Sequence, residues 1–145
     1  MINHLGGPGG VDTSAAKLAQ WKADIADVAS SCPNVVMKCG GIQMVNSGRG
    51  FEQRPAPIGS EELCAAVLPF YQHVISHFTP QRCMFESNFP PDKECVSHRV
   101  LYNAFKRIAN AMGLSAADKR DIFHDTAVKA YRLDEPFGAA LTMKL

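Results

Sequence analysis

The residues best able to do chemistry follow a short apolar run in the second half of the chain. Residues 83–85 are apolar, and the next three, Glu-Ser-Asn at 86–88, carry hydrogen-bonding side chains. Two prolines at 90–91 then stop any central strand, because proline has no N–H to donate to a sheet. A strand, a polar loop and a following helix make one βα unit, and in parallel α/β folds the loops beyond the carboxyl ends of the strands carry the site. We therefore expect the functional site in this loop.

Three basic side chains are candidates for binding an anionic substrate. Lys38 lies near the carboxyl end of a second apolar run at residues 35–39. Its ammonium group could meet a substrate carboxylate there, although a lysine that extends out of the sheet edge is at least as common. Arg49 and Arg54 are the cations of a long loop without periodic pattern at residues 42–59. Their planar guanidinium groups suit carboxylates, and two solvated arginines are the alternative.

The pattern of apolar residues places these side chains on alternating strands and helices. It predicts strands at about residues 1–5, 34–39 and 82–87, and helices at about 12–30, 60–78, 101–112 and 115–131. Such alternation indicates an α/β fold with a mostly parallel sheet covered by helices. Because βα units wound with one hand bring all strand ends to one face, His4, Lys38 and Asn88 should lie at the same end of the sheet.

Composition narrows the classes of function. The 145 residues are 46% hydrophobic and 20% charged with a net charge of +1, which gives no reason to expect nucleic acid or a membrane surface as partner. No apolar run approaches the roughly 20 residues that span a bilayer. Residues 1–4 lack the features of a signal peptide, so we expect a cytoplasmic protein. The five cysteines form no C-x-x-C pair, and reduced thiols are expected rather than disulfides or a zinc ribbon.

Four motifs keep a fixed order along the chain: NHLGGP at 3–8, VVMKCGG at 35–41, RCMFESNFP at 82–90 and FHDTAVKAYRL at 123–133. Together they resemble the amidohydrolase-related proteins, TIM-barrel enzymes that include aminocarboxymuconate-semialdehyde decarboxylase and 2-pyrone-4,6-dicarboxylate lactonase. The resemblance implies the C-terminal part of a (β/α)8 barrel at residues 1–133, followed by a tail at 134–145. A full barrel needs about 250 residues, so we expect only its C-terminal half.

The resemblance gives roles to two residues. His4 stands at the place of the family's histidine that ends a middle barrel strand and binds the metal or the polarised oxygen of the substrate. Asn88 stands at the place of the family's last-strand aspartate, a metal ligand or the base that activates water. Asparagine can neither take a proton nor bring negative charge to a cation, and the family's H-x-H pair has no counterpart here. The implied cofactor is a divalent metal, zinc or manganese, bound weakly or not at all, and metal-independent chemistry is the open alternative.

The resemblance implies a hydrolase of lactonase, amidohydrolase or decarboxylase type that acts on a small carboxylated or cyclic ester substrate. In this interpretation His4 polarises the substrate or holds the metal, and Asn88 orients a water or a substrate carbonyl. The substrate's carboxylate would bind to Lys38, Arg49 or Arg54. The alternative is a non-catalytic remnant that works through association with another chain, either a second copy or one that supplies the N-terminal half of the barrel.

Overall fold

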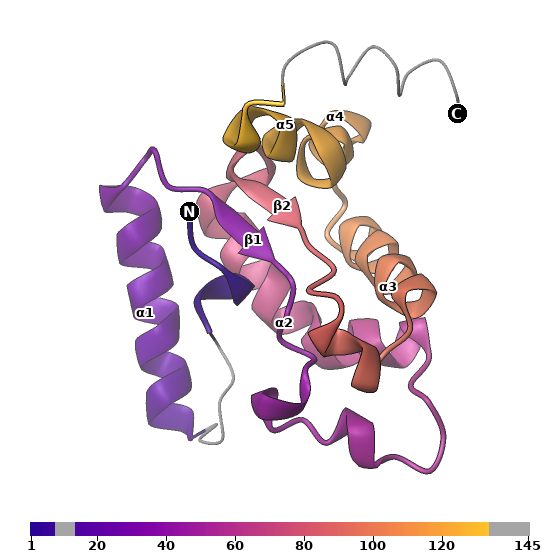
Figure 1. The fold of residues 1–145 in the computed structure, drawn as a ribbon. Helices are drawn as coiled ribbons and strands as arrows, with labels where there is room; N and C mark the ends of the chain where they lie inside the picture. Colours follow the sequence, from indigo (N-terminus) through magenta and orange to yellow (C-terminus); the bar gives the residue numbers. More distant parts are fainter. Residues whose placement is uncertain (8–13, 134–145) are drawn as a thin grey trace, which may run out of the picture.

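The computed structural model describes residues 1–7 and 14–133. The tail predicted at 134–145 and the first residues of the helix predicted at 12–30 lie outside these ranges. The strands are β1 (Met37–Cys39) and β2 (Cys83–Phe85), and the helices are α1 (Ala15–Ser31), α2 (Ser60–Phe78), α3 (His98–Ala111), α4 (Ala116–Arg120) and α5 (Thr126–Tyr131) (Figure 1). Within these residues, no helix combines the length and the apolar character needed to cross a bilayer.

The sheet is parallel, as the sequence predicts. β1 pairs with β2 so that Met37 faces Cys83 and Cys39 faces Phe85. On the other side of β1, Ile2 forms a parallel bridge to Met37, held by hydrogen bonds from its N–H to Val36 O at 2.9 Å and from Lys38 N–H to its own C=O at 2.8 Å. The three predicted strands are therefore neighbours, with β1 in the middle.

The first strand is shorter than the prediction of residues 1–5. Only Ile2 pairs with β1, because a 3-10 turn at His4–Gly6 follows almost at once. His4 and Leu5 have positive φ angles of 55° and 52°, and a left-handed backbone cannot continue a strand. The turn is held inward by Trp21 of α1, whose indole Nε1–H donates to Leu5 O at 2.9 Å.

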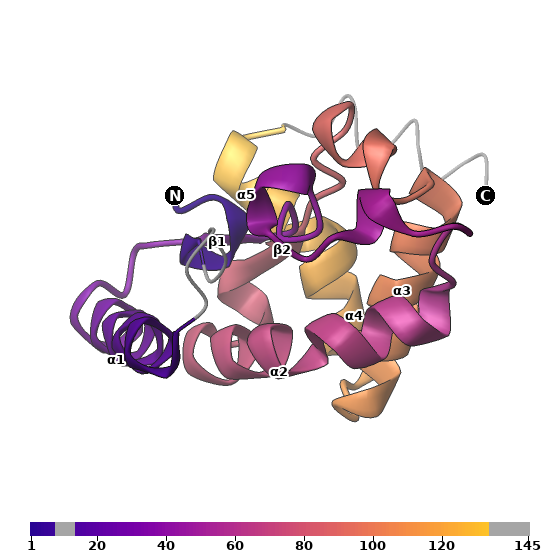
Figure 2. The ribbon, with the colours of Figure 1, turned by 90° about the horizontal axis from the view of Figure 1, so that it is seen from below.

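One face of the sheet packs against the helices and forms the core. Side chains two residues apart on a strand share a face, and Cys39 and Cys83 on this face are fully buried. Phe85 stacks on Phe105 of α3 with ring centroids 4.4 Å apart and contacts Tyr71 of α2 at 6.1 Å. Figure 2 shows α1 and α2 in one layer beneath the strands, with α3 beside them. The other face carries Lys38 and the buried Met84, which pair across the two strands.

Arg82 ties the ends of two helices to the start of β2. Its Nη2 donates to Ala29 O at 2.8 Å and its Nη1 to Cys32 O at 3.1 Å, both at the C-terminal end of α1. Its Nε donates to Phe78 O at 3.0 Å at the end of α2, and its guanidinium carbon lies 4.9 Å from the centre of the Phe78 ring. The last carbonyls of a helix have no partner within the helix and carry partial negative charge, so one cation satisfies both ends.

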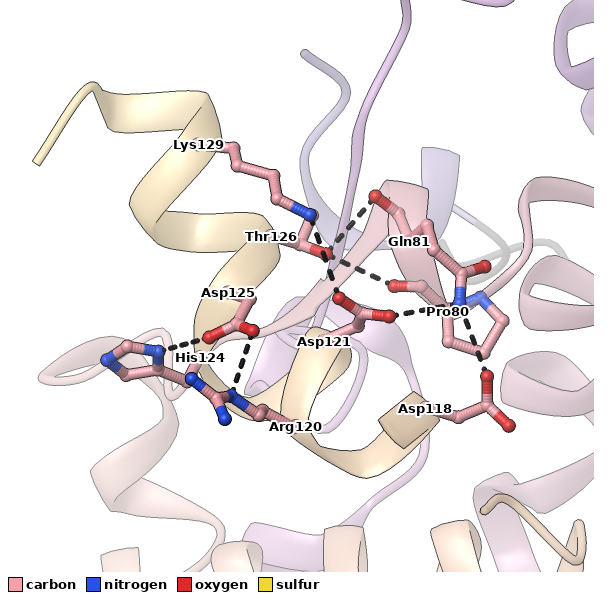
Figure 3. Close-up of polar contacts among 9 residues, drawn as sticks. All are labelled: Pro80, Gln81, Asp118, Arg120, Asp121, His124, Asp125, Thr126 and Lys129. Atoms are coloured by element: carbon pink, nitrogen blue, oxygen red, sulfur yellow. Dashed lines mark hydrogen bonds and ion pairs between the residues drawn. The ribbon is translucent and has the colours of Figure 1, made fainter. Parts of the chain in front are cut away.

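The C-terminal helices dock onto Pro80 and Gln81, in the 3-10 turn before β2 (Figure 3). The buried Thr126 hydroxyl lies 3.2 Å from both Pro80 O and Gln81 O, and can donate to either. The Gln81 amide donates to Asp118 at 3.2 Å and to Asp121 at 3.0 Å. A π-helical turn at Asp121–Asp125 joins α4 to α5, so the helix predicted over residues 115–131 is continuous along the chain but not uniform.

Candidate active site

A single carboxylate joins two of the predicted site residues. Glu86, directly after β2, places Oε1 2.8 Å from Nδ1 of His4 and Oε2 2.5 Å from Nζ of Lys38. The side chains are 33% exposed for His4, 22% for Lys38 and 11% for Glu86. The contact with Glu86 is the main reason why the pKa of Lys38 is raised. His4 and Lys38 thus meet at the carboxyl end of the strands, on the face of the sheet away from the helices.

The imidazole of His4 is held on one side only. Its Nδ1 faces Glu86 at ion-pair distance, although the angle falls outside the range of a hydrogen bond. The backbone N–H of His4 donates to the same carboxylate oxygen at 3.3 Å. Nε2 contacts no polar group among residues 1–7 and 14–133. In the tautomer with the proton on Nδ1, Nε2 presents a lone pair.

Two glycines allow this close approach. A Cβ atom added at Gly40 would overlap the backbone oxygen of Glu86, and one added at Gly41 would overlap Nδ1 of His4 and lie 2.8 Å from its Cγ. Gly41 also has a φ of +73°, which side chains rarely adopt. Glycine is therefore needed at both positions after β1, because Glu86 and His4 fill the space that a side chain would take.

Gly41→Ala should destabilise the fold by about 2 kcal/mol more than Gly50→Ala, because only the first adds overpacking to the backbone strain. Gly50 is a matched control: its φ is +67° and nothing lies within 4 Å of an added Cβ. The measurement is urea unfolding of both variants and of the wild type. Equal losses of stability would show that His4 does not occupy the space beside residue 41.

Asn88 belongs to a second polar cluster next to the first. Its Nδ2 donates to Asp92 Oδ1 at 2.8 Å and contacts Met44 Sδ at 3.7 Å. The other oxygen of Asp92 accepts a short hydrogen bond from Gln43 Nε2. Asp92 is fully buried, and burial raises the pKa of its carboxyl group. His4 and Glu86 lie near enough to act on the same carboxyl electrostatically, so the two clusters form one region.

The two loop arginines lie apart from Glu86. Arg49 donates from Nε to Ile42 O at 2.9 Å and stacks 4.4 Å over the Phe70 ring, and burial lowers its pKa. Its Nη2 is buried and has no hydrogen-bond partner in the described part of the chain. Arg54 forms a two-pronged ion pair with Glu62 at 2.7 and 2.9 Å. The structure brings neither arginine into contact with His4 or Asn88, and their role in carboxylate binding stays a prediction.

An open groove lies between the loops that follow β1 and β2. Its volume is about 530 Å³, and it is lined by aromatic rings from both loops, Phe51 and Phe89, together with His98 at the start of α3. Its wall carries both charges, from Arg54 and Lys93 and from Glu52 and Glu94, and neither His4 nor Glu86 is among its lining residues. Pockets that combine aromatic surface with a few charged groups are the usual form of a small-molecule site.

Comparison with known proteins decides the family. The amidohydrolase family matches residues 1–133. The chain belongs to this family. It is 32% identical over 113 residues to the protein y4mH of Sinorhizobium fredii, covering 78% of this chain and 33% of that protein. It is 29% identical over 144 residues to the L-fucono-1,5-lactonase of Burkholderia multivorans, covering 97% of this chain and 45% of the lactonase.

The fold of this amidohydrolase chain also has a solved counterpart. A crystal structure of an amidohydrolase from Burkholderia multivorans with bound zinc matches it with a TM-score of 0.73 at 24% identity, covering 90% of this chain and 43% of that one. The α/β architecture expected for part of a TIM barrel is therefore confirmed. The chain spans less than half the length of the curated relatives it matches.

The residues described in this amidohydrolase chain do not fit a metal by themselves. Nowhere in residues 1–7 and 14–133 do three or more His, Cys, Asp or Glu side chains converge as a metal site requires. Nδ1 of His4 is directed at Glu86, and Asn88 contributes its amide to Asp92. The paired histidines of α2 offer no alternative, since His73 uses Nε2 to contact Lys22 O at 3.0 Å. Weak or absent metal binding by this chain stays a prediction.

Two residues of the site were not assigned a role from the sequence. The sequence predicts Glu86 only as part of the polar loop and does not single out Asp92. A signal for Glu86 exists, because residues two apart in a strand share a face. Glu86 therefore lies on the face of Met84, which pairs with Lys38. For Asp92 the signal is its position four residues after Asn88 with a turn between them, closed by a hydrogen bond from Asp92 N–H to Asn88 O at 3.2 Å.

Proposed function

We propose that this amidohydrolase chain carries part of the active site of a lactonase, a hydrolase that opens a small cyclic ester. The observation that carries the proposal is the pairing of His4 with Glu86 beside Lys38 at the carboxyl ends of the strands. A histidine oriented by a carboxylate on one nitrogen and open on the other is suited to general base catalysis. The 29% identity to an L-fucono-1,5-lactonase supports a cyclic ester as substrate.

The proposed reaction uses His4 as the base. Water gives a proton to Nε2 of His4 as its oxygen forms a bond to the carbonyl carbon of the lactone. The ring C–O bond then breaks, and the ring oxygen takes the proton from His4, so that the product is a hydroxy acid. Glu86 stabilises the imidazolium that exists between these steps, and Lys38 holds the second oxygen of Glu86 in place.

The other predicted residues have positioning roles in this proposal. Asn88 orients the attacking water through its Oδ1 oxygen, which accepts no hydrogen bond from any other residue in the described ranges. A carboxylate on the substrate would bind to Arg54 on the groove wall in place of Glu62, or to Arg49, whose buried Nη2 would first have to become exposed. Lys38 is paired with Glu86 and Arg54 with Glu62, so either cation would have to leave a carboxylate of the protein to bind the substrate.

Hydrolysis of L-fucono-1,5-lactone should depend on His4. We expect His4→Gln to lower kcat by about a hundredfold or more, since general base catalysis contributes about 10²–10⁴-fold. The measurement is base uptake at constant pH with the lactone and, for comparison, with an amide of the same sugar acid. His77→Gln is the control, because His77 is exposed on α2. The absence of lactone hydrolysis, or its survival in His4→Gln, would contradict the proposal.

A further inference from the structure

Asp92 is a buried carboxylate held only by neutral groups. It has no exposed surface, and no lysine, arginine or histidine of residues 1–7 and 14–133 forms an ion pair with it. Its two oxygens accept hydrogen bonds from Nδ2 of Asn88 and Nε2 of Gln43. Its backbone oxygen accepts from the N–H groups of Cys95 and Val96 at 3.0 and 2.9 Å.

Such an arrangement is costly for the fold. A carboxylate loses its hydration on burial, and amide donors return only part of that free energy. The raised pKa of Asp92 reflects this cost, since burial is its main cause. An apolar side chain of similar size would fill the same space at lower cost, so stability alone is a poor reason for an acid at position 92.

The carboxylate fixes which end of each carboxamide faces it. Asn88 places one N–H on Asp92 and has Met44 Sδ as the second contact of its NH2 group. Its carbonyl oxygen must then point away from Asp92. Gln43 is turned in the same sense, and its Oε1 is buried without a hydrogen-bond partner in the described part of the chain. An amide side chain can flip when both ends have equal partners, and here only one end meets an acceptor.

The backbone holds the pair in this geometry. Asn88 has a φ of 52°, in the left-handed region that asparagine tolerates better than most residues. The chain turns back at once, with the hydrogen bond from Asp92 N–H to Asn88 O. This turn brings the Asp92 carboxylate next to the Asn88 side chain, within hydrogen-bond distance of its Nδ2.

We propose that Asp92 is a positioning residue for the hydrolytic reaction: it turns the carboxamide of Asn88 so that Oδ1 is a fixed hydrogen-bond acceptor for the attacking water. The inference rests on the proposed lactonase function. An acceptor on one hydrogen of the water, with Nε2 of His4 on the other, leaves a lone pair of the water oxygen for the ester carbonyl. Gln43 is the second contact that keeps the Asp92 carboxylate from rotating.

Asp92→Asn tests the inference because it replaces one of the two acceptor oxygens by an NH2 group. The new side chain then has one acceptor oxygen for the two amide donors, Asn88 and Gln43. We expect kcat for the lactone to fall by about 10–100-fold, with KM within about twofold of the wild type. Asp24→Asn is the matched control, since Asp24 also accepts from a carboxamide, Gln20 Nε2 at 2.7 Å, but on the exposed surface of α1. Gln43→Met removes one of the two donors and should reduce kcat less than Asp92→Asn.

A second readout does not depend on activity. In the ¹⁵N-resolved NMR spectrum of the full chain, the side-chain NH2 protons of Asn88 and Gln43 should exchange slowly with water, and Asp92→Asn should remove that protection from Asn88. Asp24→Asn should leave both groups protected. The backbone signals of the same samples show whether each variant is folded.

The two readouts separate the possible failures. Fast exchange of the Asn88 NH2 protons in the wild type, or protection that survives in Asp92→Asn, would overturn the orienting contact. Protection lost without a fall in kcat would overturn the role in the reaction. A wild type that is inactive on lactones but shows protected NH2 groups would refute the proposed function and with it the water-orienting role, while the orientation of Asn88 by Asp92 would stand.

Discussion

Replacing Glu86 by Gln should reduce lactone hydrolysis by about a hundredfold to a thousandfold, because the histidine base loses the charge that orients it. Glu86 is the one residue of the site that contacts both His4 and Lys38. A glutamine keeps the shape but brings no negative charge to either partner. It also presents an NH2 group to one of them, where both require an acceptor. The measurement is kcat for the lactone at pH 7, beside the wild type.

The same variant should lose about 2 kcal/mol of unfolding free energy at neutral pH, the usual worth of a hydrogen bond to a charged group. Because the folded-state pKa of Lys38 is raised, its pairing stabilises the fold at pH values below its ordinary pKa of 10.5. That stabilisation disappears as the pH rises through the raised value. The difference in unfolding free energy between the wild type and Glu86→Gln should therefore be constant near neutral pH and become smaller at alkaline pH.

Glu61→Gln is the control for both effects. Glu61 faces Arg107 at 3.9 Å and its side chain is 87% exposed. We therefore expect Glu61→Gln to lose less than about 0.5 kcal/mol of unfolding free energy and to keep the kcat of the wild type. If Glu86→Gln hydrolysed the lactone as fast as the wild type, the pairing of His4 with Glu86 would have no part in the reaction.

Arg82→Met should lower the free energy of unfolding by about 3 kcal/mol, at about 1 kcal/mol for each of three hydrogen bonds shorter than 3.2 Å. The variant leaves carbonyl groups of α1 and α2 without a partner, and methionine retains most of the apolar stem. Arg82→Lys should recover little of the loss, because one ammonium group cannot reach both helix ends as the guanidinium fork does.

Urea unfolding at pH 7 measures these losses, and Arg107→Met is the control. Arg107 lies half-exposed on α3 and contacts Ser60 Oγ at 3.3 Å, so its replacement should cost less than about 0.5 kcal/mol. Equal stability of Arg82→Met and Arg107→Met would mean that water satisfies the helix ends as well as Arg82 does.

The parallel direction of the strands could be predicted from the sequence, whereas their lengths could not. Strands alternating with amphipathic helices permit few arrangements other than a parallel sheet. The early end of the first strand depends on positive φ angles at His4 and Leu5, which neither residue type signals. The π-helical turn at Asp121–Asp125 has the same apolar spacing as a regular helix, and here it brings the Phe123 ring 4.7 Å from that of Phe85.

The site could be predicted in part, because parallel winding fixes the end of the sheet at which its residues lie. Parallel winding predicted that Lys38 and His4 would lie at one end of the sheet, and both contact Glu86 there. Which carboxylate would join them depends on side-chain directions across 82 positions of sequence, and no local pattern encodes that. Arg54 shows the reverse case: its type suited a substrate carboxylate, but Glu62 at the start of α2 offers a carboxylate of the protein itself.

The contact between His4 and Gly41 has a consequence for how the sequence can change over evolution. Since any side chain at position 41 would need the space that the imidazole fills, the two positions cannot vary independently. A descendant that lost His4 would regain that space, and the left-handed backbone at 41 would then admit asparagine before other residues. The imidazole of His4 is thus one reason why position 41 must be glycine. Once His4 was lost, substitutions at position 41 would no longer be excluded by overlap with its ring.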